Sequence, residues 1–285
     1  MEKTSWSVRE ILYWTRKHLK RAGIEAARFE AEVLLAHALG TERLELYLNP
    51  QRVLSIKERA RFKQLIAKRV QGAPLQYLIG TVDFMGCELG VNKAVLIPRF
   101  ETEELVEKVL QDVNSQSALN ILELGTGSGA IAIALAQHLK QAKITATDIS
   151  AEALEVARKN AQHNGVFEKI IFLKSDWFSE VSGAFDVIIS NPPYVDSQSL
   201  RELPKEVKQE PQIALDGGEA GLEAIRTIIE QAPLYLVEGG RLYLEIGETQ
   251  AQSVFALARK TFRTAEILKD SASRDRFLRA FKADG

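Results

Sequence analysis

The stretch Glu123-Leu124-Gly125-Thr126-Gly127-Ser128-Gly129-Ala130 decides the fold, because it joins a strand-like run at 119–124 to a helical run at 130–139. Its glycines let the backbone approach a ligand closely, and the amides that open a helix can donate hydrogen bonds to that ligand. The spacing Gly-x-Gly-x-Gly is one residue shorter than the dinucleotide fingerprint Gly-x-Gly-x-x-Gly. Taken alone, the loop is equally consistent with a tight turn.

Strands and helices alternate on the C-terminal side of this loop, which predicts βαβ units around a parallel sheet. Strand-like runs lie at 119–124, 143–147, 169–173, 185–190 and 240–246, and helical runs at 130–139, 151–162, 220–236 and 250–261. The strand-like runs 265–268 and 276–281 are too close for a crossover helix, so the last strand is expected to run antiparallel. We therefore predict an α/β fold with a Rossmann-like, seven-stranded sheet, and the antiparallel ending is typical of class I methyltransferases.

Residues 5–70 have a helical pattern throughout. Apolar side chains recur there at three- and four-residue spacing, as one buried helical face requires: Leu12, Leu19, Phe29, Val33, Leu34, Ala38 and Leu39. Gly23 and Gly40 are expected to end helices, and Ser55 followed by Glu58 predicts a capping box. These features predict a small bundle of four or five helices.

A different pattern follows the bundle. Short strand-like runs at 77–80, 84–86 and 95–97 are punctuated by glycine, which predicts a β-hairpin that joins two domains. The expected organisation is a helical, substrate-docking domain at 1–72, the hairpin linker at 73–98 and the catalytic domain at 99–285.

The composition fits a globular, core-forming protein, with 46% hydrophobic residues in 285. Its apolar runs are too short to span a bilayer and its N-terminus lacks an apolar signal region, so we expect a cytoplasmic protein without a membrane partner. The single cysteine, Cys87, and four histidines without ligand-like spacing predict neither an intrachain disulfide nor a metal site.

The net charge of −1 is unevenly distributed along the chain. Residues 1–72 contain 15 lysines and arginines and 8 aspartates and glutamates, a net charge of +7, whereas the remainder carries −8. The helical domain is therefore expected to prefer an acidic partner, protein or nucleic acid. A solvated basic surface without a partner is the alternative.

Acidic and aromatic residues follow the predicted strands, at the edge where open α/β sheets bind ligands. Asp148 ends the second strand, where it can accept hydrogen bonds from both hydroxyls of a ribose, and Asp176-Trp177 follows the third, where an adenine would lie. Each has an ordinary explanation, since Asp148 can cap a helix in competition with Ser150 and Trp177 can be a core residue. Their coincidence at consecutive strand ends favours a ligand.

The ligand that this edge suggests is S-adenosylmethionine. Its sulfonium and ammonium groups are cationic and favour nearby acids such as Glu123. A nicotinamide dinucleotide carries a pyrophosphate and would favour the longer glycine loop and fewer acids.

The tetrapeptide Asn191-Pro192-Pro193-Tyr194 follows the fourth strand and suggests methyl transfer to a planar nitrogen. The lone pair of such a nitrogen is delocalised, so the site must hold acceptors where its N–H groups point. Asn191 offers a side-chain carbonyl, Pro192 a backbone carbonyl and Tyr194 a flat face for stacking, while the prolines stiffen the turn. A proline-rich turn without a function is the simpler alternative.

With these motifs the chain resembles the release factor glutamine methyltransferases, the PrmC or HemK family, over nearly its whole length. The matching segments are Glu123–Gly129, Ser175–Phe178, Ser190–Val195, Leu96–Arg99 with Glu101–Glu103, Glu210-Pro211, Ala214-Leu215 and Gly217-Gly218. The glycine loop and the Asn-Pro-Pro-Tyr motif are shared with DNA and RNA methyltransferases. The Ile-Pro-Arg segment and the helical domain are far more specific.

The resemblance implies methyl transfer from S-adenosylmethionine to the side-chain nitrogen, N5, of the glutamine in the Gly-Gly-Gln motif of peptide chain release factors. The expected cofactor-binding residues are Glu123, Gly125, Thr126, Gly127, Ser128, Gly129, Asp148, Asp176, Trp177 and Asn191. The expected substrate-binding residues are Asn191, Pro192, Pro193 and Tyr194, with catalytic roles for Asn191, Pro192 and Tyr194. The family usually has a second proline after Ile-Pro-Arg; this chain has Phe100 there, which is expected to pack over the cofactor or the substrate glutamine.

Two other functions remain open at this point. An enzyme that methylates an exocyclic base nitrogen in DNA or RNA would use the same acceptors, but it usually needs a basic recognition domain and must flip the base out. A non-catalytic adaptor could retain the fold and lose the reaction. For the favoured function we expect a monomer that makes no direct contact with nucleic acid.

Overall fold

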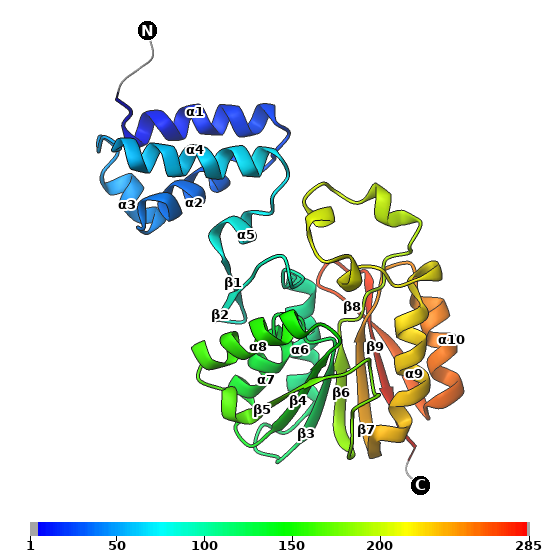
Figure 1. Ribbon diagram of the computed structural model, residues 1–285. Coiled ribbons are helices and arrows are strands. Elements are labelled where there is room, and N and C mark those ends of the chain that lie inside the picture. The colour runs from blue at the N-terminus through cyan, green and yellow to red at the C-terminus, as the bar shows by residue number, and fades with distance from the viewer. Residues whose placement is uncertain (1–4, 284–285) are drawn as a thin grey trace. The chain divides into compact units, whose positions relative to one another are not determined.

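The computed structural model describes residues 5–283, which divide into two compact units (Figure 1). Unit 1 contains the chain up to Gly80 together with Lys205–Gln209, and unit 2 contains Thr81–Pro204 and the chain from Glu210 onward.

Unit 1 is a helical bundle built on one apolar core. Its helices are α1 (Val8–Arg21), α2 (Ala27–Leu39), α3 (Arg43–Leu48), α4 (Ile56–Val70) and the short α5 (Leu75–Ile79). The predicted capping box of Ser55 and Glu58 is confirmed at the start of α4, and Gly40 ends α2 in the left-handed conformation. Leu19 and Leu34 are fully buried in the core, as predicted.

The prediction that Phe29 belongs to the buried face is wrong. Its side chain is 47% exposed and the Arg43 guanidinium lies over its ring, 4.7 Å from the centroid. The buried face of α2 contains Ala27, Ala31, Leu34 and Ala38. Phe29 lies two positions from both Ala27 and Ala31, so the helical period of 3.6 turns it to the opposite side.

A buried ion pair holds unit 1 together. Arg69 at the end of α4 donates to both carboxylate oxygens of Glu30 on α2, at 2.5 and 3.0 Å, and also contacts Glu206 at 2.8 Å. The planar guanidinium suits such a bidentate pair. The contact with Glu206 explains why Lys205–Gln209 belongs to this unit.

The hairpin is confirmed, but none of the three runs assigned to it matches a strand: Phe84 ends the first strand, and Met85 and Gly86 form the turn. It consists of β1 (Thr81–Phe84) and β2 (Cys87–Gly90), which pair antiparallel. Residues 77–80 instead belong to α5 and its end, because Pro74 opens a helix there and Gly80 closes it with φ +91°. Residues 95–97 form no strand, since Pro98 removes a backbone donor and the segment is fixed by a carboxylate described below.

Unit 2 is a seven-stranded sheet in the order β5-β4-β3-β6-β7-β9-β8. Its strands are β3 (Asn120–Leu124), β4 (Lys143–Asp148), β5 (Ile170–Lys174), β6 (Phe185–Ser190), β7 (Leu236–Glu245), β8 (Thr264–Lys269) and β9 (Asp275–Phe281). The strands β3 to β7 are parallel to one another, and β9 runs antiparallel between β7 and β8, as predicted. The predicted α/β fold is therefore confirmed.

Helices cover both faces of this sheet (Figure 1). The first face packs against α6 (Phe100–Asp112), α7 (Ala130–His138) and α8 (Ala151–His163), and the second against α9 (Glu223–Tyr235) and α10 (Ala251–Thr261). The chain runs outward from β3 to β5 and then returns to place β6 on the other side of β3. The sheet therefore has a switch point at β3 and β6, where ligands of open α/β sheets bind.

Among the described residues, no helix has the length and apolar character that a membrane span requires.

Candidate active site

A buried carboxyl group holds the glycine loop after β3 in place from the protein interior. Glu123 is 1% exposed and accepts hydrogen bonds from the Thr126 hydroxyl at 2.8 Å and from the Ala132 amide at 3.0 Å, both on Oε2. Complete burial raises its pKa to about 8. Glu123 and Thr126 thus shape the loop from inside the protein, whereas the sequence suggested that both contact the cofactor.

The carboxylate at the end of β4 faces this loop. Asp148 accepts a hydrogen bond from the Gly127 amide at 2.8 Å and another from the Ser150 amide at 2.9 Å. Burial raises the pKa of Asp148, although these amide bonds act in the opposite direction. Ser150, not Asp148, caps α8 with its side chain. The competing explanation for Asp148 as the helix cap therefore fails.

Ser128 and Gly129 serve packing. The Ser128 carbonyl accepts from Asn160 on α8 at 2.8 Å, and the same amide group bonds to Gly90 of the hairpin. A Cβ atom at Gly129 would lie 3.1 Å from the Cβ of Ala157 and 3.1 Å from Cδ1 of Ile133. Only glycine lets α7 and α8 approach this closely without displacement.

Asp176 and Trp177 follow β5 at the same edge. Asp176 is exposed, and Trp177 is half-buried with a left-handed φ of +47°. Such a conformation is unusual for a large side chain and is typical of functional loops. Hydrogen bonds from the Ser175 hydroxyl to the Trp177 carbonyl and from the Glu180 amide to that hydroxyl hold the turn.

The turn after β6 is fixed at both ends. Asn191 donates from Nδ2 to the Thr102 hydroxyl at 2.9 Å, and the Tyr194 hydroxyl donates to Glu245 at 3.1 Å. Burial and the Glu245 charge raise the pKa of Tyr194 well above its usual value. A Cβ at Gly221 would lie 2.0 Å from the Tyr194 carbonyl oxygen, so the segment that covers this turn requires glycine there.

A cavity of about 380 Å³ joins these strand ends. Of the predicted site residues, its wall contains Gly125, Gly127, Asp148, Asp176, Trp177, Asn191 and Pro193. The remaining predicted residues lie outside this wall: Glu123, Thr126, Ser128 and Gly129 under the loop, Pro192 buried, Tyr194 packed on the core, and Phe100 exposed at the first residue of α6. Proline is also favoured at that first helical position.

The charge of this wall fits a cationic ligand. The described lining residues include four carboxylates, those of Asp148, Asp176, Asp216 and Glu223, and contain neither lysine nor arginine. A pyrophosphate would lack a cationic partner there, whereas the sulfonium and ammonium groups of S-adenosylmethionine would be favoured. The negative charge of the cavity wall therefore fits that cofactor.

Several residues of the site were not predicted. Ile149, Ile213 and Thr227 line the cavity, and nothing in the sequence distinguishes them from surface residues. Glu210 is buried and accepts from the Ile97 amide and the Arg99 guanidinium, which fixes the segment that precedes α6. Glu245 ends β7, so the strand-end position that identified Asp148 could have identified it too.

The sheet with its antiparallel ending, the glycine loop and the acidic cavity define a class I S-adenosylmethionine-dependent methyltransferase. Residues 10–80 match the family described as PrmC N-terminal domain, and residues 102–210 match the methyltransferase small domain. The chain belongs to the release factor glutamine methyltransferase family, as the resemblance of its motifs predicted.

Two relatives bear the name release factor glutamine methyltransferase. The protein from Moorella thermoacetica is 41% identical over 281 residues, which cover 98% of this chain and 99% of that protein. The protein from Geobacter sulfurreducens is 40% identical over 258 residues, which cover 90% and 89%. A methyltransferase structure from Pyrococcus furiosus, 24% identical, aligns with a TM-score of 0.54 over 70% of this chain and 90% of that one, which shows a shared fold.

Proposed function

We propose that this protein transfers a methyl group from S-adenosylmethionine to the side-chain nitrogen of the glutamine in the Gly-Gly-Gln motif of peptide chain release factors. The observation that supports it most is that Asn191 lies in the wall of the same cavity as Gly125, Gly127 and Asp148. The near-full-length similarity to two enzymes named for this reaction gives the substrate class.

The cofactor would be held at the strand ends. Asp148 is a fixed acceptor for the ribose hydroxyls, because its carboxylate is already oriented by two backbone amides. Ile149 and Trp177 offer apolar surface for the adenine. When bound, the cofactor supplies the methyl group on a positively charged sulfur.

The chain's own contribution to the chemistry is to hold the glutamine amide. Its nitrogen is a weak nucleophile, and acceptors for its two hydrogens favour the form in which the lone pair is available. We assign these acceptors to the Asn191 side-chain oxygen, which lies in the cavity wall, and to the backbone carbonyl of Pro192, which stands between the wall residues Asn191 and Pro193. Tyr194 packs on the core outside this wall, so its expected role as a stacking surface would require its ring to become accessible to the substrate. Alignment of the nitrogen with the methyl group then accounts for most of the rate. The displaced proton passes to water.

Unit 1 would dock the release factor. The outward residues of α4 include Lys57, Arg61, Lys63 and Lys68, all exposed, in a region of net charge +7. Arg59 is half-buried and its Nε lies inside the unit, so it contributes less to the surface. A positive surface attracts an acidic protein and accelerates its encounter with the enzyme.

Labelled methyl transfer tests this function. The protein and labelled S-adenosylmethionine are incubated with a release factor, with the same factor carrying Gly-Gly-Ala, and with duplex DNA or RNA. We expect label on the intact factor alone. Label on nucleic acid would support the base-methylating alternative. Absence of cofactor binding in calorimetric titration would support the adaptor.

Three further properties of the protein are its compartment, its oligomeric state and its contact with nucleic acid. We infer that it acts in the cytoplasm, where translation factors work, as a monomer and without direct nucleic acid contact. Light scattering on the purified protein, alone and with a release factor, measures its oligomeric state. Migration with RNA or DNA in a binding assay would contradict the last inference.

A further inference from the structure

Three polar side chains behind Asn191 form a chain of hydrogen bonds that ends on a buried acid. Asn191 Nδ2 donates to Thr102 Oγ1 at 2.9 Å, and Thr102 Oγ1 donates to Glu245 Oε2 at 2.7 Å. The other carboxyl oxygen, Oε1, accepts from the Tyr194 hydroxyl at 3.1 Å. Thr102 is 4% exposed and Glu245 1%, so water does not compete for these bonds.

The direction of the bonds follows from chemistry. An ionised carboxylate can only accept, so the single hydroxyl hydrogen of Thr102 is used on Glu245. The Thr102 oxygen can then only accept from Asn191, which therefore presents its NH₂ group to Thr102. Because the side-chain amide is planar, its carbonyl oxygen is turned the opposite way. Asn191 lies in the cavity wall, so this orientation makes its oxygen the group available to a substrate.

We propose that Thr102 and Glu245 are positioning residues that set the orientation of the Asn191 amide, so that it accepts rather than donates toward the substrate nitrogen. This inference rests on the proposed function. A reversed Asn191 amide would direct its NH₂ group at the N–H groups of the glutamine, and the acceptor would be lost. The Tyr194 hydroxyl, on the second oxygen of Glu245, ties the same acid to the substrate-binding turn.

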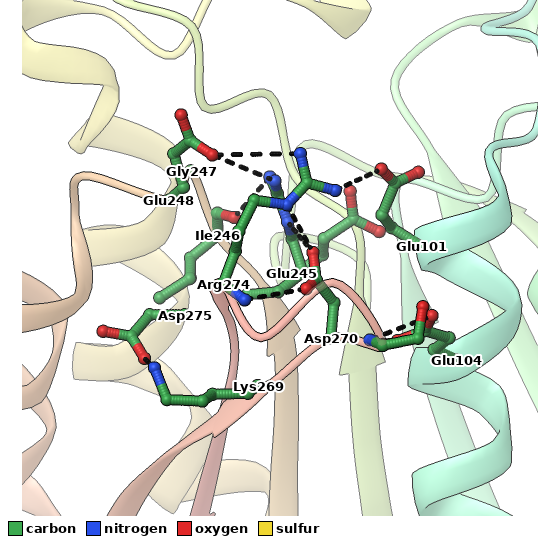
Figure 2. A network of polar contacts seen from close by, with 12 residues as sticks. Glu101, Glu104, Glu245, Ile246, Gly247, Glu248, Lys269, Asp270, Arg274 and Asp275 are labelled. Carbon is green, nitrogen blue, oxygen red and sulfur yellow. Dashed lines mark hydrogen bonds and ion pairs between the residues drawn. The ribbon is translucent and has the colours of Figure 1, made fainter.

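The acid at the end of this chain lies among charged groups (Figure 2). Glu101 on α6 and Arg276 on β9 face it, and they raise and lower its pKa respectively; burial is the larger effect and raises the pKa to about 7. Arg276 is engaged at the same time by Asp270 at 3.6 Å and Glu248 at 3.9 Å.

Protonation of Glu245 would weaken the orientation, because a neutral carboxyl group can donate to Thr102 as well as accept from it. The orienting effect is therefore complete above the folded-state pKa and is lost as the pH falls through about 7. We expect kcat to decline across this range on the acidic side. Glu245→Gln, which has nearly the same shape and does not titrate, should lack this step in its pH profile.

The decisive comparison is between Thr102→Val and Thr102→Ser. Valine keeps the shape and removes the hydroxyl, whereas serine keeps the hydroxyl and removes the methyl group. We expect Thr102→Val to lower kcat by roughly 10- to 100-fold, as misplacement of a reacting group does, with an unchanged Kd for S-adenosylmethionine. Thr102→Ser should restore most of the turnover. Thr264→Val, at an exposed threonine on β8, is the matched control.

The outcomes separate the inference from the function on which it rests. If the wild-type protein forms no methylglutamine, the proposed function itself fails. If the wild type is active and Thr102→Val turns over equally fast, or Thr102→Ser is the slower of the two, the orienting role is refuted. If Thr102→Val does not fold, the turnover and the pH profile of Glu245→Gln test the orienting role instead. Wild-type turnover together with a wild-type pH profile in Glu245→Gln would refute that role.

Discussion

Asn191 is the residue on which the proposed chemistry depends most. It directly follows the buried strand β6, lies in the cavity wall and is connected through Thr102 to Glu245. We propose its side-chain oxygen as an acceptor for the substrate amide, whereas the cofactor would have other residues to contact along the same edge. The residue should therefore matter far more for transfer than for cofactor affinity.

We expect Asn191→Ala to lower kcat by at least about 100-fold, the effect of removing one preorganised hydrogen-bonding group at a reacting centre. The Kd for S-adenosylmethionine should rise only a few-fold. Single-turnover transfer and calorimetric titration measure the two quantities. Ser199→Ala, an exposed polar residue outside the cavity wall, serves as the control. Wild-type turnover in Asn191→Ala would refute the assigned role.

Residues at strand ends could be predicted from the sequence, but the side to which they turn could not. Asp148 and Trp177 lie in the cavity wall, whereas Glu123 and Thr126 bond to each other beneath the loop. All four lie within three residues of the end of a strand, Glu123 and Asp148 inside it and Thr126 and Trp177 beyond it. Which ones face the ligand depends on loop backbone angles, which glycine leaves almost unrestricted.

Among the elements, α7 and α8 pack closely together beside the switch point of the sheet because the glycine loop ends in Gly129. Gly129 has φ +85° and faces Ala157 of α8. Gly165 has a similar φ of +70°, but a Cβ there would meet nothing within 4 Å. Alanine substitutions at the two glycines therefore distinguish the cost of backbone strain, present at both, from the cost of close packing, present only at Gly129.

We expect Gly129→Ala to lower the free energy of unfolding by about 2–4 kcal/mol, since left-handed strain adds to overpacking. Gly165→Ala should cost only about 1–2 kcal/mol, from the backbone alone. Urea unfolding of both variants gives the comparison. Equal losses would mean that packing at Gly129 contributes nothing beyond strain.

The order and type of the elements in unit 2 could be predicted because each strand is a buried run followed by a periodic helix. The elements within residues 73–98 are harder to predict from the sequence. Residues 77–80 are apolar and short, so their pattern does not distinguish a strand from a helical turn. The helix α5 forms there because Pro74 and Gly80 delimit it, and Leu75 and Leu78 pack on the core of unit 1.

At the scale of the whole molecule, the two units carry opposite charge and we assign them different tasks. The sequence could indicate a basic helical part and an acidic catalytic part, because charge is counted without coordinates. It could not indicate that Lys205–Gln209 belongs to unit 1, since that depends on the contact of Glu206 with Arg69 across 137 positions of sequence.

The docking proposal predicts a difference between large and small substrates. We expect Arg61→Glu combined with Lys63→Glu to raise KM for a release factor by roughly tenfold, through lost electrostatic attraction. KM for a short Gly-Gly-Gln peptide should not change. Lys140→Glu, at an exposed lysine of unit 2, controls for net charge. Equal effects on both substrates would count against docking by this surface.

We propose that a glutamine side-chain amide is methylated in the cavity at the ends of β3, β4 and β6. Mass mapping of a release factor after incubation with isotopically labelled S-adenosylmethionine tests it most directly. We expect one labelled methyl group on the side-chain nitrogen of the Gly-Gly-Gln glutamine. Label on another residue, or an unmodified factor with an enzyme that binds the cofactor, would contradict it.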